Sequence, residues 1–250
     1  MAMTTSSLEL LWGTGERPSR GPKPGLTLDR IVTAAVAVAD AEGLDAVSMR
    51  RVSTELGVGT MSLYRYVPGK TELLDLMLDR VQSESLPDAP PEPANWRTAV
   101  EQLARGHLAL YRAHPWLLKV NEARSVLGPS TLRGLELCLS GLKGEHGMGL
   151  SDHETISVIV TVQSYVAGMA RMEIQTAEAA KETGVSDEDF WEGQRPFLER
   201  AMASGDYPHM AQLAEDTFSR EDDQFAFGLD RLLDGFETLV NARRAEADAG

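Results

Sequence analysis

The side chains that could do chemistry gather in one stretch of the chain, residues 48–70, which reads SMRRVSTELGVGTMSLYRYVPGK. Its hydroxyl and guanidinium groups suit the major groove of DNA, because hydroxyls contact base edges and phosphates and arginine reads guanine or pairs with phosphate. Double-stranded DNA is therefore the partner that this stretch predicts. The residues expected in the groove are Thr60, Met61, Ser62, Tyr64, Arg65 and Tyr66, and those placed for backbone phosphates are Thr27, Arg50, Arg51 and Lys70.

Two short helices joined by a tight turn would position these groups. Apolar residues four apart mark the buried face of the first helix, and Gly57 suits its end because glycine adopts a positive φ readily. We expect Thr60 to cap the second helix, residues 60–67, in which Leu63 and Val67 face inward. This is the geometry of a helix-turn-helix, with the second helix in the major groove. The alternative is that the tyrosines are ordinary packing residues and the arginines belong to a solvated face. The helix-turn-helix spacing of all these residues together favours DNA binding over that alternative.

The stretch resembles the TetR family of one-component bacterial transcription regulators. The motifs that carry the resemblance are LDAVSMRRV at residues 44–52, LGV at 56–58, SLYRYV at 62–67, Lys70, and LL at 73–74. The resemblance implies a homodimer in which one helix links each DNA-binding domain to a C-terminal domain that binds a small molecule. The register places Leu86 where the tetracycline repressor has a drug-binding histidine near its metal, so tetracycline–magnesium is not the expected ligand.

Charge is distributed unevenly along this acidic chain of 250 residues, whose net charge is −14. Residues 17–70 contain eight Lys or Arg and five Asp or Glu, a net charge of +3, which leaves −17 for the remainder. The acidic remainder would repel DNA except at the one basic face. The single cysteine, Cys138, lies in an apolar helical setting and excludes an intramolecular disulfide. The first 25 residues lack the apolar core of a signal peptide, so we expect a cytoplasmic protein.

Helical periodicity dominates the chain, and an all-α fold is the expected class. We expect a flexible basic arm at residues 1–25, a helix-turn-helix domain with its linking helix at 26–85, a proline-rich linker at 86–94 and a helical domain at 95–250. One interpretation of the arm is that Arg17, Arg20 and Lys23 contact the minor groove of DNA. The alternative is a disordered tail that makes no contact with DNA. The expected helices span residues 27–42, 70–85, 95–114, 116–127, 130–143, 151–183, 187–203 and 222–245.

The C-terminal domain is expected to bind a small-molecule effector between its helices. Candidate lining residues combine bulk with a polar or pliable group on an apolar helix. They are His107, Tyr111, Trp116, Asn121, Tyr165, Met169, Met172, Gln175, Phe190 and Trp191. For each of them, plain core packing is the alternative.

The last helix has an apolar seam of the kind that packs helix on helix. We expect this seam, together with the helix that begins near Ser151, to form a homodimer interface; packing inside one chain is the alternative. The residues of the seam are Phe225, Leu229, Leu232, Phe236 and Leu239.

No catalytic motif, metal site or cofactor site is found in the sequence, and its histidines are scattered. The uncharged run at residues 155–170 is too short for a membrane span and indicates a buried helix. We therefore predict a non-enzymatic, ligand-responsive repressor that binds a palindromic operator as a homodimer. The alternatives are a transcriptional activator, and an all-helical small-molecule-binding protein or enzyme with a vestigial helix-turn-helix.

Overall fold

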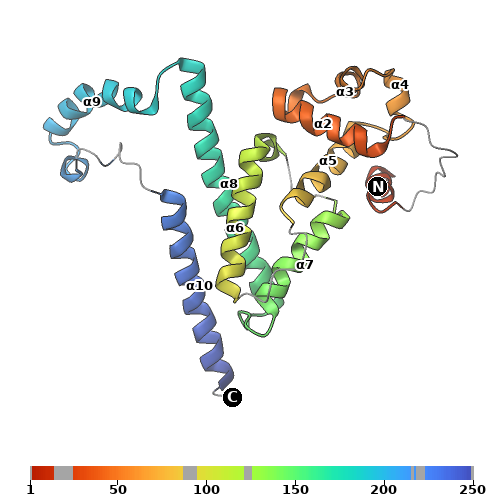
Figure 1. The fold of residues 1–250 in the computed structure, drawn as a ribbon. Coiled ribbons are helices and arrows are strands. Elements are labelled where there is room, and N and C mark those ends of the chain that lie inside the picture. The colour runs from red at the N-terminus through yellow and green to blue at the C-terminus, as the bar shows by residue number, and fades with distance from the viewer. Residues whose placement is uncertain are drawn as a thin grey trace.

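The computed structural model describes residues 2–13, 25–86, 95–120, 126–214, 217 and 223–248, without the side chains of residues 2–5 and 187. Every regular element in this part of the chain is a helix (Figure 1). The all-α fold class is therefore confirmed. No helix among the described residues has the length and apolar character needed to cross a membrane.

The head of the molecule is the group of helices from α2 to α4. It comprises α2 (Leu28–Glu42), a 3-10 turn (Leu44–Ala46), α3 (Met49–Glu55) and α4 (Thr60–Leu63). Side-chain caps fix where its longer helices begin, because Thr27 accepts the N–H of Arg30 and Ser48 accepts the N–H of Arg51. Its core closes with α5 (Lys70–Glu84) through side chains that are 0% exposed: Ile31, Val52, Leu63, Val67, Leu73 and Met77.

The turn between α3 and α4 has the predicted glycine, since Gly57 adopts a φ of 66°. Two details of the prediction are wrong. The residue that precedes α4 as its N-cap is Gly59, and Thr60 is already helical. Moreover, α4 ends at Leu63 and the chain continues as a turn, in which the Leu63 carbonyl accepts the N–H groups of both Tyr66 and Val67.

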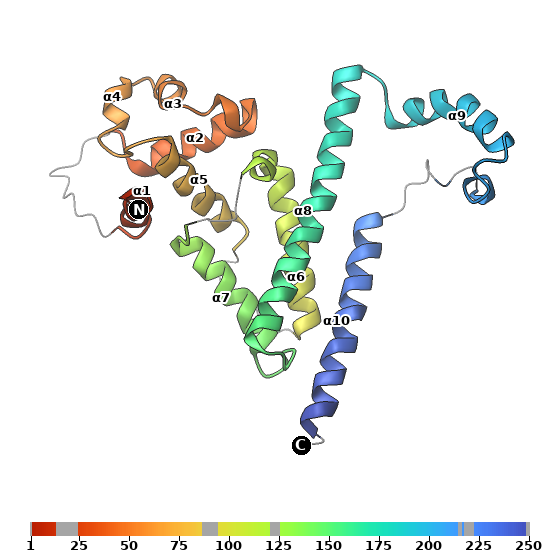
Figure 2. The same ribbon diagram turned by 180° about the vertical axis from the view of Figure 1, so that it is seen from behind.

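The body of the molecule consists of α6 (Trp96–Ala113), the 3-10 helix η2 (Pro115–Lys119), α7 (Pro129–Lys143), the first half of α8 (Asp152–Thr183) and α10 (Gln224–Asp248). Figures 1 and 2 show α6, α8 and α10 side by side, with α7 leading back to α5. The predicted capping box at Ser151 and Glu154 starts α8. From Thr155 to Ala170, α8 contributes six buried side chains to the core, but Ile156 and Val160 on its outer face are exposed, so the expectation of a helix buried on all sides is wrong.

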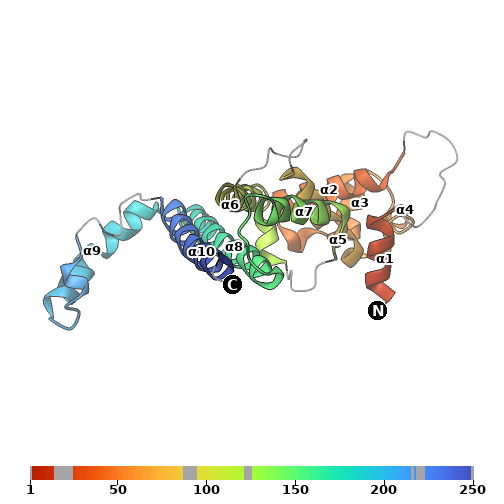
Figure 3. The same ribbon diagram turned by 90° about the horizontal axis from the view of Figure 1, so that it is seen from below.

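The second half of α8 extends beyond the body and is followed by α9 (Asp187–Ala203). Helix α9 lies on the side of the molecule opposite the head (Figure 3). We call residues 171–214, which also include the 3-10 turn Met210–Gln212, the projection. Among its described side chains none is buried. Seven of its large apolar side chains are exposed: Met172, Val185, Phe190, Phe197, Tyr207, Met210 and Leu213.

An N-terminal helix, α1 (Ala2–Leu11), was not expected from the sequence. It lies against α5 (Figure 3), where the buried Ser7 hydroxyl donates to the Asp75 carboxylate. The Trp12 indole N–H donates to the Leu127 carbonyl at 3.3 Å. Tertiary contacts therefore hold a helix whose own sequence carries little periodicity. The basic residues Arg17, Arg20 and Lys23 lie outside the described residues.

The helix expected at residues 116–127 is also wrong in its described part. The 3-10 helix η2 takes its place, because Pro115 begins a tight turn after α6 has ended, and residues 121–125 lie outside the described part. The expected linker lies largely outside it as well. The remaining expected helices are present with boundaries shifted by a few residues.

Candidate DNA-binding surface and effector pocket

The outer side of α4 and of the turn after it is the candidate DNA-binding surface. Met61 is 76% exposed, Tyr64 45% and Tyr66 39%, whereas Leu63 and Val67 between them are fully buried. Arg65 is also exposed and Ser62 is half-buried. The buried pair anchors the surface to the head, so the outward groups are presented on a rigid support, which direct reading of base edges requires.

Thr60 does not project as freely as the sequence suggested. Its hydroxyl lies 2.8 Å from the hydroxyl of Ser53 on α3. The Ser53 hydroxyl also lies 2.8 Å from the Arg50 carbonyl, so the α3 side of this contact is fixed. The bond joins the two helices of the helix-turn-helix, and Thr60 therefore has a structural task in addition to the proposed DNA contact.

Arg51 is held by carboxylates rather than directed at a phosphate. Its guanidinium donates to Glu42 at 2.6 Å and to Glu55 at 2.8 Å. The pKa of Glu42 is lowered, chiefly by the hydrogen bond from Arg51. Both ends of its fork are occupied, so the phosphate contact of Arg51, which stays a prediction, would have to displace these carboxylates. Arg50, one residue earlier, is exposed.

Two further predicted phosphate contacts lie at helix N-termini. Lys70 is exposed at the first position of α5, whose N-cap is Gly69, so a phosphate there would meet the ammonium group and unpaired backbone N–H groups together. Thr27 is exposed at the N-terminus of α2, and its oxygen already accepts the N–H of Arg30.

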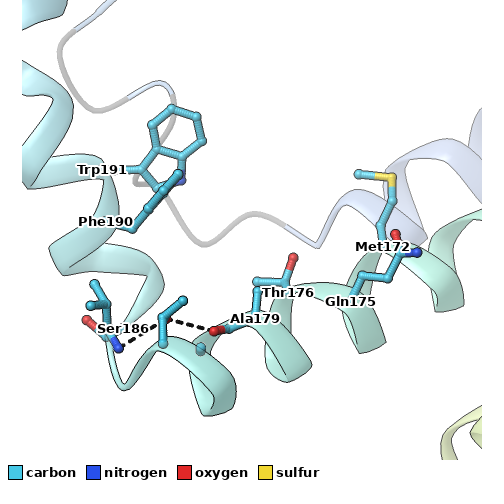
Figure 4. A pocket seen from close by; sticks show the side chains of 10 residues that line it. Met172, Gln175, Thr176, Ala179, Ser186, Phe190 and Trp191 are labelled. Carbon is cyan, nitrogen blue, oxygen red and sulfur yellow. Dashed lines mark hydrogen bonds between the residues drawn. The ribbon is translucent and has the colours of Figure 1, made fainter.

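Four predicted effector contacts meet in a pocket at the elbow between α8 and α9. Figure 4 shows Met172 and Gln175 on α8 facing toward Phe190 and Trp191 on α9. The pocket has a volume of about 430 Å³. The sequence prediction missed the small and hydroxyl residues that make room for it, which carry no chemical signal of their own: Thr176, Ala179, Ala180, Thr183, Val185 and Ser186.

The other effector candidates do not line this pocket. Tyr165 stacks on Phe225 and donates its hydroxyl to the Phe225 carbonyl, so it fastens α8 to the start of α10. Tyr111 and Trp116 are buried in the core, Met169 is half-buried, and Asn121 lies outside the described residues.

His107 lies between α6 and α8 and is the most polar of the candidates outside the elbow. Its Nδ1 lies 2.9 Å from the Leu103 carbonyl, and its Nε2 lies 3.3 Å from the Gln163 amide nitrogen. Burial lowers the pKa of His107, although the Leu103 carbonyl opposes this. A neutral ring that donates from Nδ1 and accepts at Nε2 satisfies both neighbours.

Part of the predicted dimer seam is used inside the chain. Leu229 is buried against the chain's own core, and Phe225, Phe236 and Leu239 pack on that core as well. A second copy could therefore not use Leu229 as its contact, which corrects the expectation for that residue. Leu232 is half-buried.

Polar contacts at the ends of α5 and α6 were missed by the sequence analysis. Asp79, a buried carboxylate of α5, accepts the N–H groups of Ser130 and Thr131 in the first turn of α7. His114, which follows α6, contacts Asp40 of α2 and Glu84 of α5. The contacts with Asp40 and Glu84 span 74 and 30 residues, so no local spacing could have indicated them.

A small helix-turn-helix head with an exposed second helix, joined by α5 to an all-helical body, defines a DNA-binding transcription regulator. Comparison with family models agrees. Residues 31–77 match the model for bacterial regulatory proteins of the tetR family, and residues 89–240 match the tetracyclin repressor-like C-terminal domain. The chain belongs to the TetR family, and the predictions of family and of a DNA-binding regulator are confirmed.

Individual relatives extend the match to nearly the whole chain. The HTH-type transcriptional repressor DrrR1 of Streptomyces coeruleorubidus is 58% identical over 241 residues, which are 96% of this chain and 88% of the relative. An HTH-type transcriptional regulator of Saccharopolyspora erythraea is 32% identical over 65% of this chain and 67% of its own length. These relatives are regulators of transcription, which favours a protein that is not an enzyme.

A solved structure with the same fold is apo ActR of Streptomyces coelicolor. It is 30% identical, with a TM-score of 0.68 over 89% of this chain and 99% of its own. ActR has also been solved in complex with actinorhodin, a structure that matches with a TM-score of 0.68 at 29% identity over 86% of this chain and 96% of its own.

Proposed function

We propose that the protein is a cytoplasmic, homodimeric transcription repressor that binds an inverted-repeat operator and leaves it when a small molecule binds the C-terminal domain. It has no catalytic activity. The observation that carries the proposal is the surface of α4 and of the turn after it, where Met61, Tyr64 and Tyr66 are exposed while Leu63 and Val67 are fully buried. The name of its 58% identical relative, a transcriptional repressor, supports repression over activation.

The second copy would pack against the outer face of α8 and the start of α10. Ile156 and Val160 lie one helical turn apart on α8 and are 44% and 54% exposed, and no charged residue occurs between them. Phe227 on α10 is exposed as well. With the half-buried Leu232, these residues replace the fully buried Leu229 in the proposed interface. Burying such apolar side chains is the usual source of stability in a permanent dimer.

The effector would be a small molecule with an apolar, aromatic body. The complex of ActR with actinorhodin supports a small-molecule ligand for this fold. In this chain the elbow pocket combines the Phe190–Trp191 edge-to-face pair with the thioether of Met172, a pliable apolar wall, while Gln175 and Thr176 supply polar contacts.

The proposal is tested with DNA selected from a random duplex library by the purified protein. We expect an enriched inverted repeat. Tyr64→Ala and Lys70→Ala should each weaken binding of that DNA at least fivefold in fluorescence anisotropy, because each removes a groove or phosphate contact worth ~1–3 kcal/mol. Tyr207→Ala is the matched control, since Tyr207 is a similarly exposed tyrosine on the projection, far from α4. No enriched sequence from folded protein would refute the proposal.

A further inference from the structure

A buried histidine joins the head to the body of the molecule. His114 follows the last turn of α6 and is 6% exposed. Its Nδ1 lies 2.7 Å from Oδ1 of Asp40, in the last turn of α2, and its Nε2 lies 3.0 Å from Oε2 of Glu84, the last residue of α5. Ionised carboxylates only accept hydrogen bonds, so the ring satisfies both contacts only when both nitrogens carry a proton and the imidazole is positively charged.

Residues of α2, α5 and η2 surround the His114 ring. Asp40 also accepts the indole N–H of Trp116 at 2.7 Å, and the Trp116 ring lies edge-on to the His114 ring with centroids 6.1 Å apart. The charged groups that face the ring are Asp40 on α2 and Glu84 on α5. Their charged neighbours on the same helices are engaged elsewhere, Glu42 with Arg51 and Arg80 with Asp29, and Lys119 on η2 is exposed.

The cluster lies where the head could rotate against the body. The helix α5 belongs to both parts, because it packs on α2 in the core of the head and its Asp79 caps α7 of the body. The helix α2 reaches the body directly at η2, where Asp40 bonds to His114 and Trp116. Any rotation of α2 relative to α6 must therefore break the bonds of Asp40.

We infer that His114 is a positioning residue for the operator: its imidazolium holds α2 against the ends of α5 and α6 in the orientation that binds DNA. The inference rests on the proposed function, because it names how the body controls the head of a repressor. An effector that displaces the end of α6 separates His114 from Asp40, and loss of the proton from the ring removes one of its two donors. Both events release the head, so operator affinity depends on pH as well as on the effector.

The direction of the pH dependence follows from the environment of the ring. Burial disfavours the charged form, but the hydrogen bonds that the ring donates to Asp40 and Glu84 outweigh it, and the pKa of His114 is raised above its ordinary value. If the released ring has its ordinary pKa of about 6.5, the proton stabilises the bonded arrangement fully below that pH, and this stabilisation is lost as the pH rises through the raised value. Operator affinity should therefore fall as the solution becomes alkaline.

The test compares operator affinity at a series of pH values from 6 to 9 for the wild-type dimer, His114→Gln and the control His209→Gln, whose histidine is exposed in the projection. We expect wild-type and control affinity to fall at least fivefold across the series, the lower end of typical coupling between sites. His114→Gln should bind more weakly at pH 6 and lose most of this dependence. Asp40→Asn should do the same, since a neutral amide no longer favours the imidazolium.

A measurement on the wild-type protein covers the case in which these variants do not fold. The pKa of His114, followed by NMR of the isotope-labelled ring, should rise when the selected operator is added. If protonation of His114 raises the affinity for DNA, bound DNA must raise the affinity of His114 for the proton by the same factor. An unchanged pKa, or superimposable pH profiles for wild type and folded His114→Gln, would overturn the inference. Absence of operator binding by the wild type at pH 6 would instead refute the proposed function.

Discussion

The head and the projection contain similar kinds of side chain but use them in opposite ways. In the head, apolar residues of α2, α3 and α4 meet one another and α5, and four of them are 0% exposed: Ile31, Ala35, Val52 and Leu63. In the projection, no described apolar side chain of α8 or α9 is buried, and Phe197 is 70% exposed. A short segment thus becomes rigid when its own chain closes the core around it, whereas a long helix does not become part of the core merely because it is helical.

The largest expected effect is on the free energy of unfolding when a large apolar side chain is shortened to alanine in the head or in the projection. Leu63→Ala should lower the free energy of unfolding by about 2–5 kcal/mol, because it leaves a cavity in a closed core. Phe197→Ala removes a larger side chain but should change stability by less than about 0.5 kcal/mol, since its ring is mostly hydrated. Urea unfolding at low protein concentration, followed by circular dichroism, measures both.

Met61→Ala is the control inside the head, because Met61 is two residues from Leu63 and 76% exposed. It should be nearly neutral for stability. Equal destabilisation by Phe197→Ala and Leu63→Ala would contradict the comparison and would mean that the projection is packed in solution.

A smaller effect is expected at the helix caps. Ser48 and Ser186 use the same chemistry, each accepting a backbone N–H three residues ahead, at 3.1 Å and 3.0 Å. Ser48→Ala should cost about 0.5–2 kcal/mol of global stability, because α3 belongs to the closed core. Ser186→Ala should leave global unfolding unchanged and speed hydrogen exchange only within α9. The idea fails if both substitutions shift the unfolding midpoint equally.

The smallest expected effect is a pH-dependent change in melting temperature that distinguishes the packed first half of α8 from its projecting second half. Arg243 of α10 lowers the pKa of Glu154 to about 2, with help from Ser151. A carboxylate with a lowered pKa stabilises the fold at pH values above its unfolded pKa, about 4.3, and this contribution disappears as the pH falls toward about 2. Glu154→Gln should therefore lower the melting temperature slightly at pH 7, and the difference should shrink in acid.

Glu182→Gln, in the projecting half of α8, is the matched control and should change nothing at any pH. A Glu154→Gln difference that stays constant from pH 7 down to pH 2 would mean that the loss arises from packing and not from the charge.

Local signals in the sequence were sufficient for the helix-turn-helix. Leu63 and Val67 identify the inner side of α4 and of the turn after it by spacing alone, and Gly57 marks the turn before α4. Long-range contacts were not accessible in this way. The sequence predicted a phosphate contact for Arg51 but did not indicate its hydrogen bond to Glu42, nine residues earlier. In the same way, α1 depends on α5, and a periodic seam on α10 could not reveal that Leu229 packs inside its own chain.

The elbow pocket was predictable in its large residues and not in its shape. Met172, Gln175, Phe190 and Trp191 stood out because they combine bulk with a polar or pliable group. That they meet depends on the reversal at Gly184, which adopts a φ of 69° and ends α8. The sequence indicates that a turn occurs there, but it does not encode the direction in which α9 leaves.

The contact between Asp79 and the start of α7 also carries an evolutionary consequence. Gly128 precedes α7 so closely to Asp79 that a Cβ at residue 128 would collide with the carboxylate. Residue 128 can therefore gain a side chain only if residue 79 becomes smaller, and the lost acceptor for Ser130 and Thr131 must then be replaced. Among homologous sequences, positions 79 and 128 should vary together or not at all.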